Sequence, residues 1–205
     1  MGNEFGEIAF TPSVKAMQEK LGSRKAYAAL EAGAHHNNEL GSDESDFIVA
    51  RDSFYMASVS ETNWPYVQHR GGPAGFVKVL DARTLGFADY RGNRQYVSVG
   101  NVLKNDRVSL FFMDYPHRTR LKLLGHAELI GTERTEVLES LSVPQYKAKV
   151  ERGILIHVAA YDWNCPQHIT PRFTEEEIET AIQPLRQRIA TLEAQLAAAT
   201  GRKAP

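Results

Sequence analysis

The segment GNRQYVSVGN, residues 92–101, has the composition of a phosphate-binding turn. Arg94 stands among asparagine, glutamine and serine side chains, and the segment leads into an expected helix. Arginine offers a phosphate a planar, bidentate donor, and Asn93, Ser98 and the amides at the helix start would add neutral donors. Neither a P-loop nor a Rossmann fingerprint is present in this segment. The alternative interpretation is a polar turn whose arginine faces solvent.

A second polar group lies in the segment WPYVQHRGGPAGFVK, residues 64–78. Gln68, His69 and Arg70 are consecutive, whereas a half-buried strand would alternate polar with apolar residues. Three polar residues in a row indicate a strand edge that faces a ligand or a partner. The glycines that follow would let the backbone approach a flat ligand closely. The alternative is a surface strand that runs into a Gly-Pro turn.

The segment NCPQHI places Cys165 and His168 at a spacing that two metal ligands could use, with His157 nearby in the sequence. A structural zinc ion usually takes four ligands, and no second cluster accompanies this pair, so we expect no metal site. The sequence places no base beside Cys165, so we do not expect a catalytic cysteine. A structural turn before Pro166 is the better interpretation.

Short strands separated by tight turns must position these residues. The sequence predicts helices at residues 12–32, interrupted at Gly22-Ser23, and at 43–52. After these helices the pattern becomes strand-like. The expected strands are residues 54–60, 66–70, 76–80, 85–90, 108–115, 120–130 and 153–161, with loop and helix at 93–104 and a helix near 135–141. Strands this short indicate an antiparallel sheet or barrel.

The C-terminal segment carries a heptad pattern flanked by glutamate and arginine. Its apolar positions, spaced 4, 3, 4, 3 and 4, are Ile178, Ile182, Leu185, Ile189, Leu192 and Leu196. Because the pattern covers fewer than about three heptads, both a helix packed on its own domain and a helix paired with a partner remain open. Pro184 lies inside the pattern, so we expect the helix to start or kink there.

The composition is that of an ordinary globular chain. Its 205 residues suit one domain with short appendages, and the net charge of -1 gives no general attraction to nucleic acid or to an anionic membrane. One cysteine excludes an intrachain disulfide. The sequence shows no signal peptide and no apolar run near the roughly 18 residues of a membrane span, so we expect a soluble, cytoplasmic protein.

Four segments together resemble the FMN-binding split-barrel proteins of the pyridoxamine 5'-phosphate oxidase superfamily. They are FVKVLD at 76–81, GNRQ at 92–95, NDRVSLFF at 105–112 and RLKLLGHAE at 120–128. Their combined order and spacing carry the resemblance across roughly residues 50–130. The chain is most similar to a bacterial branch that has a QHRGGP strand, a GNRQY loop and an NCPQHI segment.

The resemblance implies a mainly β fold with flanking helices, built on a six-stranded antiparallel split β-barrel. Proteins of this kind are usually homodimers that hold two FMN molecules in grooves shared by both subunits. We therefore expect an N-terminal helical segment at residues 1–45, the FMN-binding split-barrel domain at 46–170 and a C-terminal amphipathic helix at 171–205.

The resemblance also assigns residues to the phosphate group of FMN. Asn93, Arg94 and Gln95 match the family's Ser-Arg-Lys phosphate contacts, although glutamine in the third place removes one charge. The connection from this loop to Asn105 is about three residues longer than in the family. We therefore expect Ser98 to donate some of the hydrogen bonds that hold the phosphate.

Other residues match positions beside the isoalloxazine ring. The resemblance places there the strand residues Phe76, Val77 and Lys78, the neighbouring Asp89 and Tyr90, and Arg120, which would reach the ring from the same or the other subunit. A cation such as Lys78 or Arg120 near the ring would favour the anionic, reduced cofactor. Gln68, His69 and Arg70 complete the expected cofactor site.

The C-terminal motif that holds pyridoxine phosphate in the oxidase itself is missing, so a vitamin B6 oxidase is disfavoured. We expect an FMN-dependent oxidoreductase that acts on a small molecule, with NADH or NADPH as the electron donor. Flavin supplies the redox chemistry, so no catalytic side chain is required. The alternatives are a flavin carrier without turnover, a split barrel that holds haem or a deazaflavin, and an interaction protein built around the C-terminal helix.

Overall fold

The computed structural model describes residues 3–33, 37–163 and 166–200. It divides the chain into two compact units. The first comprises Met1–Asp114 with Thr119–Gln167, and the second comprises Tyr115–Arg118 with His168–Pro205. Cys165, with its expected structural turn, lies outside the described residues.

Four short helices open the first unit: α1 (Glu4–Ala9), α2 (Pro12–Lys20), α3 (Arg24–Glu31) and α4 (Ser42–Val49). The predicted break at Gly22 separates α2 from α3, and Thr11 accepts a hydrogen bond at the start of α2, where Pro12 suits the first helical turn. Helix α1 was not expected, because six residues carry too short a pattern. Its N-cap is Asn3, whose Oδ1 accepts from the Gly6 amide at 2.8 Å.

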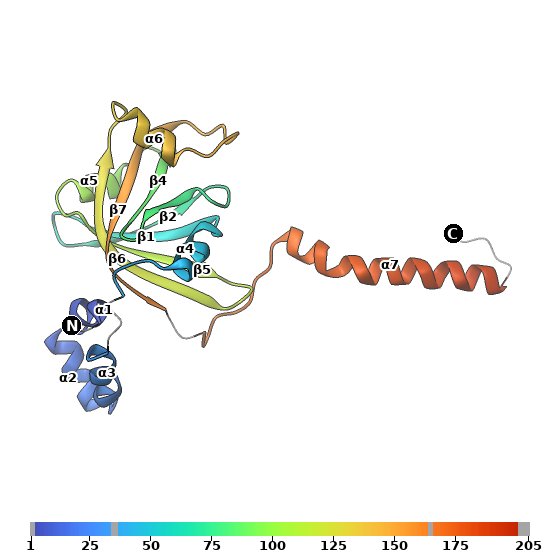
Figure 1. The fold of residues 1–205 in the computed structure, drawn as a ribbon, viewed down its shortest axis with the longest axis horizontal. Helices are drawn as coiled ribbons and strands as arrows, with labels where there is room; N and C mark the ends of the chain where they lie inside the picture. The colour runs from blue at the N-terminus through green and yellow to red at the C-terminus, as the bar shows by residue number, and fades with distance from the viewer. Residues whose placement is uncertain (1–2, 34–36, 164–165, 201–205) are drawn as a thin grey trace. The chain divides into compact units, whose positions relative to one another are not determined.

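Seven strands form one antiparallel sheet in the order β2-β1-β5-β6-β7-β4-β3 (Figure 1). They are β1 (Ser53–Val59), β2 (Pro65–Gly71), β3 (Val77–Asp81), β4 (Thr84–Tyr90), β5 (Arg107–Asp114), β6 (Thr119–Ile130) and β7 (Val150–Trp163). The expectation of a six-stranded split barrel is wrong in its strand count, because the sheet has seven strands. Each of the seven strand-like segments of the sequence forms a strand of its own.

Strand β7 holds the sheet together because it pairs with β6 along one side and with β4 along the other. Its register against β6 shifts between Leu124 and Gly125. A Cβ atom at Gly125 would lie 2.6 Å from the carbonyl oxygen of His157, so only glycine allows this close approach. Two further helices, α5 (Val97–Val102) and α6 (Thr135–Leu141), flank the sheet.

A cluster of four phenylalanine rings fills the core of the sheet. Phe54 lies at its centre, with its ring centroid 4.9 Å from that of Phe112, 5.2 Å from Phe87 and 5.9 Å from Phe76. All four side chains are at most 1% exposed. These rings come from β1, β4, β5 and the residue just before β3, so the cluster joins both halves of the sheet.

The two ends of the sheet meet through one ion pair. Strand β2 forms one end of the strand order, and β4 lies beside the last strand at the other end. Arg70 Nη1 on β2 lies 2.5 Å from Asp89 Oδ1 on β4, and both side chains are about nine-tenths buried, at 11% and 9% exposed. In the described residues no strand pairing joins these two ends, so this contact bridges the split in the sheet.

The second unit contains helix α7 (Glu175–Thr200). A capping box starts it, since Thr174 Oγ1 accepts from the Glu177 amide while Glu177 Oε2 accepts from the Thr174 amide at 2.7 Å. The helix continues through Pro184, so the expected start at that residue is wrong, while a kink there stays a prediction. Of the helices described, none has both the length and the apolar character that a membrane crossing requires.

We predict that Phe54→Ala lowers the free energy of unfolding by about 3–5 kcal/mol, because it empties the centre of the aromatic cluster. Chemical denaturation followed by circular dichroism measures this change. The matched control is Phe173→Ala, whose side chain is 59% exposed and which should shift stability by less than about 0.5 kcal/mol. Equal losses in the two variants would contradict the assigned core.

We also predict that Asp89→Asn destabilises the protein by about 3 kcal/mol, because it leaves the buried Arg70 charge without its carboxylate. Denaturation of the protein without added cofactor measures this loss. The matched control is Glu39→Gln, which breaks an ion pair with Arg83 whose two side chains are 63% and 58% exposed. An exposed pair contributes at most about 1 kcal/mol. If Glu39→Gln cost as much as Asp89→Asn, the bridging role of Arg70 and Asp89 would be wrong.

Candidate functional site

A pocket of about 260 Å³ lies where β2, β4 and the loop into α5 come together. Most of the residues expected at the cofactor border it: Gln68, Arg70, Asp89, Tyr90, Asn93, Arg94, Gln95 and Ser98. These residues come from three separate stretches of the sequence. The fold therefore brings the polar strand segment and the GNRQY loop to one place.

A second pocket of about 250 Å³ shares five residues with the first: Gln68, Arg70, Asp89, Tyr90 and Gly92. Phe76 and Phe87 give this second pocket an aromatic wall. Because the two pockets share Arg70 and Asp89, we treat them as one groove with a polar end near Arg94 and an aromatic end near Phe76.

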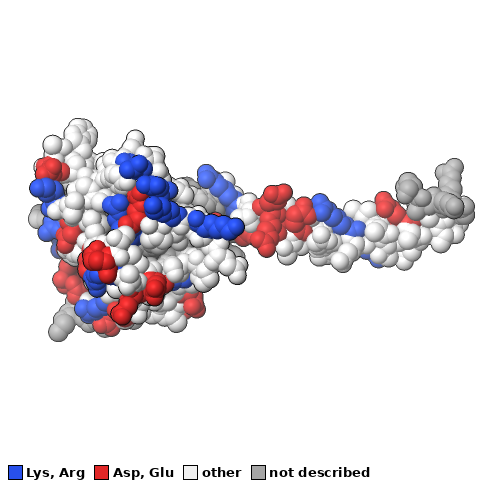
Figure 2. Space-filling view, turned by 90° about the horizontal axis from the view of Figure 1, so that it is seen from above, with Lys and Arg blue, Asp and Glu red and all other residues white. Residues whose placement is uncertain are grey.

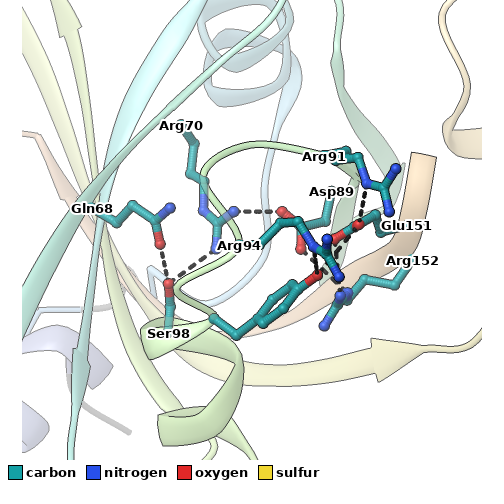
Figure 3. Close-up of polar contacts among 9 residues, drawn as sticks. Gln68, Arg70, Asp89, Arg91, Arg94, Ser98, Glu151 and Arg152 are labelled. Atoms are coloured by element: carbon teal, nitrogen blue, oxygen red, sulfur yellow. Dashed lines mark hydrogen bonds and ion pairs between the residues drawn. The ribbon is translucent and has the colours of Figure 1, made fainter. Parts of the chain in front are cut away.

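The middle of the groove is a chain of hydrogen bonds centred on Arg70 (Figure 3). Its Nη1 donates to Asp89 Oδ1, and its Nη2 donates to Ser98 Oγ at 3.1 Å. The Ser98 hydroxyl in turn donates to Gln68 Oε1. The Ser98 side chain is only 1% exposed. This series of hydrogen bonds therefore holds the start of α5 against β2.

The three consecutive polar residues of β2 do not share one face. The strand alternates, so Gln68 and Arg70 face inward while His69 is exposed on the opposite face. His69 borders the second pocket, but its ring packs edge-on against Tyr55 with 5.6 Å between centroids. The structure therefore separates His69 from the hydrogen-bond chain that the sequence grouped it with.

The polar end of the groove is organised around Glu151 on β7. Arg91 Nε lies 3.0 Å from Glu151 Oε1, and Arg152 Nη2 lies 3.3 Å from Oε2. The Tyr96 hydroxyl donates to Glu151 at 3.4 Å and accepts from Arg94 Nε at 3.2 Å. Burial raises the pKa of Glu151, but the hydrogen bonds and charges of Arg91, Tyr96 and Arg152 outweigh it, so its pKa is lowered and the carboxylate stays charged near neutral pH.

Positive charge exceeds negative charge in this cluster. Four guanidinium groups face two carboxylates, and these residues are Arg70, Arg91, Arg94, Arg152, Asp89 and Glu151. The excess of two positive charges matches the charge of about -1.5 to -2 on a phosphate monoester at neutral pH. The donor set is therefore suited to a phosphorylated ligand.

Arg94 lies on a backbone turn in an uncommon conformation. Arg94 and Tyr96 have φ angles of 62° and 54°, the left-handed region that non-glycine residues seldom adopt. Asn93 Oδ1 stabilises the turn by accepting from the Gln95 amide at 3.2 Å. The turn leaves the Arg94 side chain exposed at the pocket, and its hydrogen-bond partner among the described residues is the Tyr96 hydroxyl. Strained backbone of this kind is often found at functional sites.

Tyr90 presents an unused donor at the centre of the groove. It borders both pockets, and its buried hydroxyl has no hydrogen-bond partner in the described part of the chain. Its ring packs edge-on against Tyr146 at 4.9 Å between centroids. Burial raises the pKa of Tyr90, so the hydroxyl keeps its proton at neutral pH. A ligand oxygen or nitrogen in the groove could accept that hydrogen bond.

Three of the residues expected beside the isoalloxazine ring border neither pocket. Val77 is fully buried in the core, and Lys78 lies half-buried on the edge strand β3. Arg120 on β6 stands 5.9 Å above the Phe111 ring, and its buried Nε has no hydrogen-bond partner among described residues. Phe76 does border the second pocket, although it is only 1% exposed.

Sequence reasoning missed four residues of the contact cluster around Glu151: Arg91, Tyr96, Glu151 itself and Arg152. Tyr96 stands inside the GNRQY loop, so its place next to Arg94 was available as a signal. Glu151 and Arg152 lie more than fifty residues after Tyr96 in the sequence. The pairing of β4 with β7, which sets Asp89 opposite Arg152, brings them to the site.

Solved structures of similar shape share little sequence with this chain. HupZ of Group A Streptococcus is 15% identical, with 65% of this chain and 100% of that chain covered and a TM-score of 0.49. An FMN-binding protein from Syntrophomonas wolfei is 8% identical, with 73% and 97% covered and a TM-score of 0.45. A protein related to general stress protein 26, from Clostridium acetobutylicum, is 14% identical, with 66% and 94% covered and a TM-score of 0.44.

Sequence comparison gives the family. A search of curated proteins found no match. The family profile described as pyridoxamine 5'-phosphate oxidase matches residues 43–163, which is more than half of the chain and includes every strand of the sheet and all of the groove. The chain therefore belongs to the pyridoxamine 5'-phosphate oxidase family.

Proposed function

We propose that this protein binds FMN in the groove and uses it as an oxidoreductase on a small molecule, with NADH or NADPH as the electron donor. The observation that carries the proposal is a cluster of four arginines and two carboxylates, with an excess of two positive charges, beside a groove that also has an aromatic wall. FMN has the same polarity, with a phosphate at one end and a flat ring at the other. Membership of the family supports the same assignment.

Arg94 is the residue that we expect to hold the phosphate. The guanidinium groups of Arg70 and Arg91 each bind a carboxylate directly, whereas Arg94 donates only to a tyrosine hydroxyl. Two of its nitrogens therefore remain available for a bidentate contact. Asn93 and Gln95 would add side-chain amide donors beside it. Ser98, which is engaged with Arg70 and Gln68, would mainly fix the position of the loop.

The aromatic end would receive the ring. Phe76 and Phe87 supply a flat apolar wall, and the Tyr90 hydroxyl and the Gln68 amide supply donors at its side. Flavin supplies the hydride chemistry when bound, and the protein orients it and excludes competing reactions. A protonated Tyr90 can donate to the ring across the neutral pH range, because its pKa is raised by burial.

We also propose that the complete site needs a second copy of the chain. Arg120 lies outside the groove of its own chain and carries a buried donor without a partner among described residues. In a homodimer of the kind that the family resemblance implies, Arg120 would reach the ring held by the other subunit.

The phosphate assignment is tested by comparing FMN with riboflavin, which lacks the phosphate. We expect wild-type protein to prefer FMN, and Arg94→Met to weaken FMN binding about 10- to 100-fold through loss of a charged hydrogen bond. Riboflavin affinity should stay nearly unchanged. Fluorescence titration of both ligands measures the two dissociation constants.

The matched control is Arg107→Met, which removes an exposed arginine outside the groove and should leave FMN affinity unchanged. If Arg94→Met weakened riboflavin and FMN by the same factor, Arg94 would have no role at the phosphate. If wild-type protein bound neither ligand, the FMN assignment itself would be wrong.

Turnover is tested separately from binding. We expect anaerobic addition of NADH or NADPH to bleach the flavin absorbance at about 450 nm, because a redox enzyme must pass electrons to its bound cofactor. A stopped-flow spectrometer follows the loss of colour in the reconstituted protein. Tight FMN binding with no bleaching by either nucleotide would instead point to a flavin carrier or to a different electron donor.

A further inference from the structure

Helix α7 exposes a continuous apolar stripe along its length. The helix has 26 residues, and none of its side chains is buried. The largest apolar side chains on the stripe are 45–64% exposed, namely Ile178, Leu185, Ile189, Leu192 and Leu196. Exposed apolar side chains in a row are costly in water and usually mark a surface that another chain covers.

The stripe follows the two core positions of a heptad repeat. Ile182 and Ile189 occupy position a, and Leu185 and Leu192 occupy position d. Ile178 and Ala199 extend the d positions, and Leu196 is the next a position. Isoleucine at a with leucine at d is the combination that favours two parallel strands.

The charged positions beside the stripe favour the same arrangement. Arg188 falls at position g and Glu193 at position e, and in a parallel pair the g residue of one helix faces the e residue five places on in its partner. Arg188 and Glu193 have no ion pair among the described residues, and no charged residue lies three or four places from either on the helix. Two-fold symmetry would thus form two new ion pairs.

An antiparallel arrangement would place like charges together. With the apolar stripes fully overlapped, Arg188 would face Arg188 of the other helix, Arg186 would face Arg186, and Glu179 would face Glu193. Figure 2 shows the alternation that produces this mismatch, with acidic, basic and again acidic side chains along α7. Like charges directly opposite are unfavourable, so the sequence selects against this orientation.

Pro184 does not interrupt the stripe. It falls at position c, on the outward side of the heptad, and the helix continues through it. Glu179 and Arg186 form an ion pair at 2.6 Å that spans the proline. Because Pro184 has no amide hydrogen, the helix lacks one backbone hydrogen bond there, but no side chain is removed from the apolar stripe.

We propose that α7 pairs in parallel and in register with α7 of a second copy of this chain, as a two-stranded coiled coil. About three heptads give only a marginal coiled coil in isolation. Any second contact between the same two chains would raise the effective concentration of the helices and strengthen the pairing. The proposal concerns the second unit alone and does not depend on whether the groove binds FMN.

Disulfide cross-linking reads out the orientation directly. In a Cys165→Ser background, Ala199→Cys puts one thiol at a d position, where a parallel pair brings the two copies into contact. In the antiparallel pair the two thiols would lie about 36 Å apart, at 1.5 Å per residue over the helix. We expect Ala199→Cys to form a covalent dimer under mild oxidation on a non-reducing gel.

The matched control is Ala194→Cys, at the outward position f on the same helix. A dimer formed through the sheet units alone would cross-link both variants equally, whereas the coiled coil favours position 199. Cross-linking of Ala199→Cys no faster than Ala194→Cys would overturn the proposal. Flavin titration on the same proteins reports on the groove independently.

Charge reversal tests the pairing of Arg188 with Glu193. In the Ala199→Cys protein, Arg188→Glu or Glu193→Arg alone sets like charges together, and we expect the cross-linking rate to fall about threefold to tenfold for two exposed pairs. The double variant, Arg188→Glu with Glu193→Arg, restores attraction and should recover the original rate. Additive losses in the double variant would show that the two residues do not face each other.

Discussion

The contact between Arg70 and Asp89 is the constraint on which the site depends. It joins strand β2, at one end of the sheet, to strand β4, which lies next to the strand at the other end. The same guanidinium binds Ser98 and so fixes the start of α5, the helix that follows the turn of Arg94. The groove therefore exists because one buried arginine satisfies two partners from different parts of the chain. Burial makes the pair effective, since both charges would be costly without each other.

The arginines of the site divide into two groups. Arg70 and Arg91 are directly neutralised by carboxylates and hold the walls of the groove. Arg94 is exposed on a strained turn, and within the described part of the chain it donates to the Tyr96 hydroxyl and to no carboxylate. A neutralised cation positions other groups, whereas an unneutralised one attracts an anion. This division explains how a chain with a net charge of -1 can offer a local anion site.

The proposals for the two units rest on different kinds of evidence. The groove in the first unit is formed by residues that lie far apart in the sequence, and its proposed ligand follows from the charges and rings that the fold gathers. Helix α7 in the second unit is a local structure, and its proposed partner follows from a repeat of seven residues alone. The proposed homodimer would connect them, because it would cover the exposed stripe and would bring the buried Arg120 donor, which has no partner among the described residues, to the groove of the other copy.

The sequence by itself determined the strand segments, the break at Gly22, the heptad stripe and the family, because these depend on neighbours within a few residues or on a repeated motif. The composition of the loop at residues 92–101 also predicted Arg94 as a phosphate ligand, which stays a prediction. Only the tertiary structure decided that there are seven strands, that His69 turns away from Gln68 and Arg70, and that Val77 is buried in the core. Glu151 and Arg152 joined the site through the register of β7 against β4. Strand pairing and its register depend on contacts between distant residues, which no local pattern records.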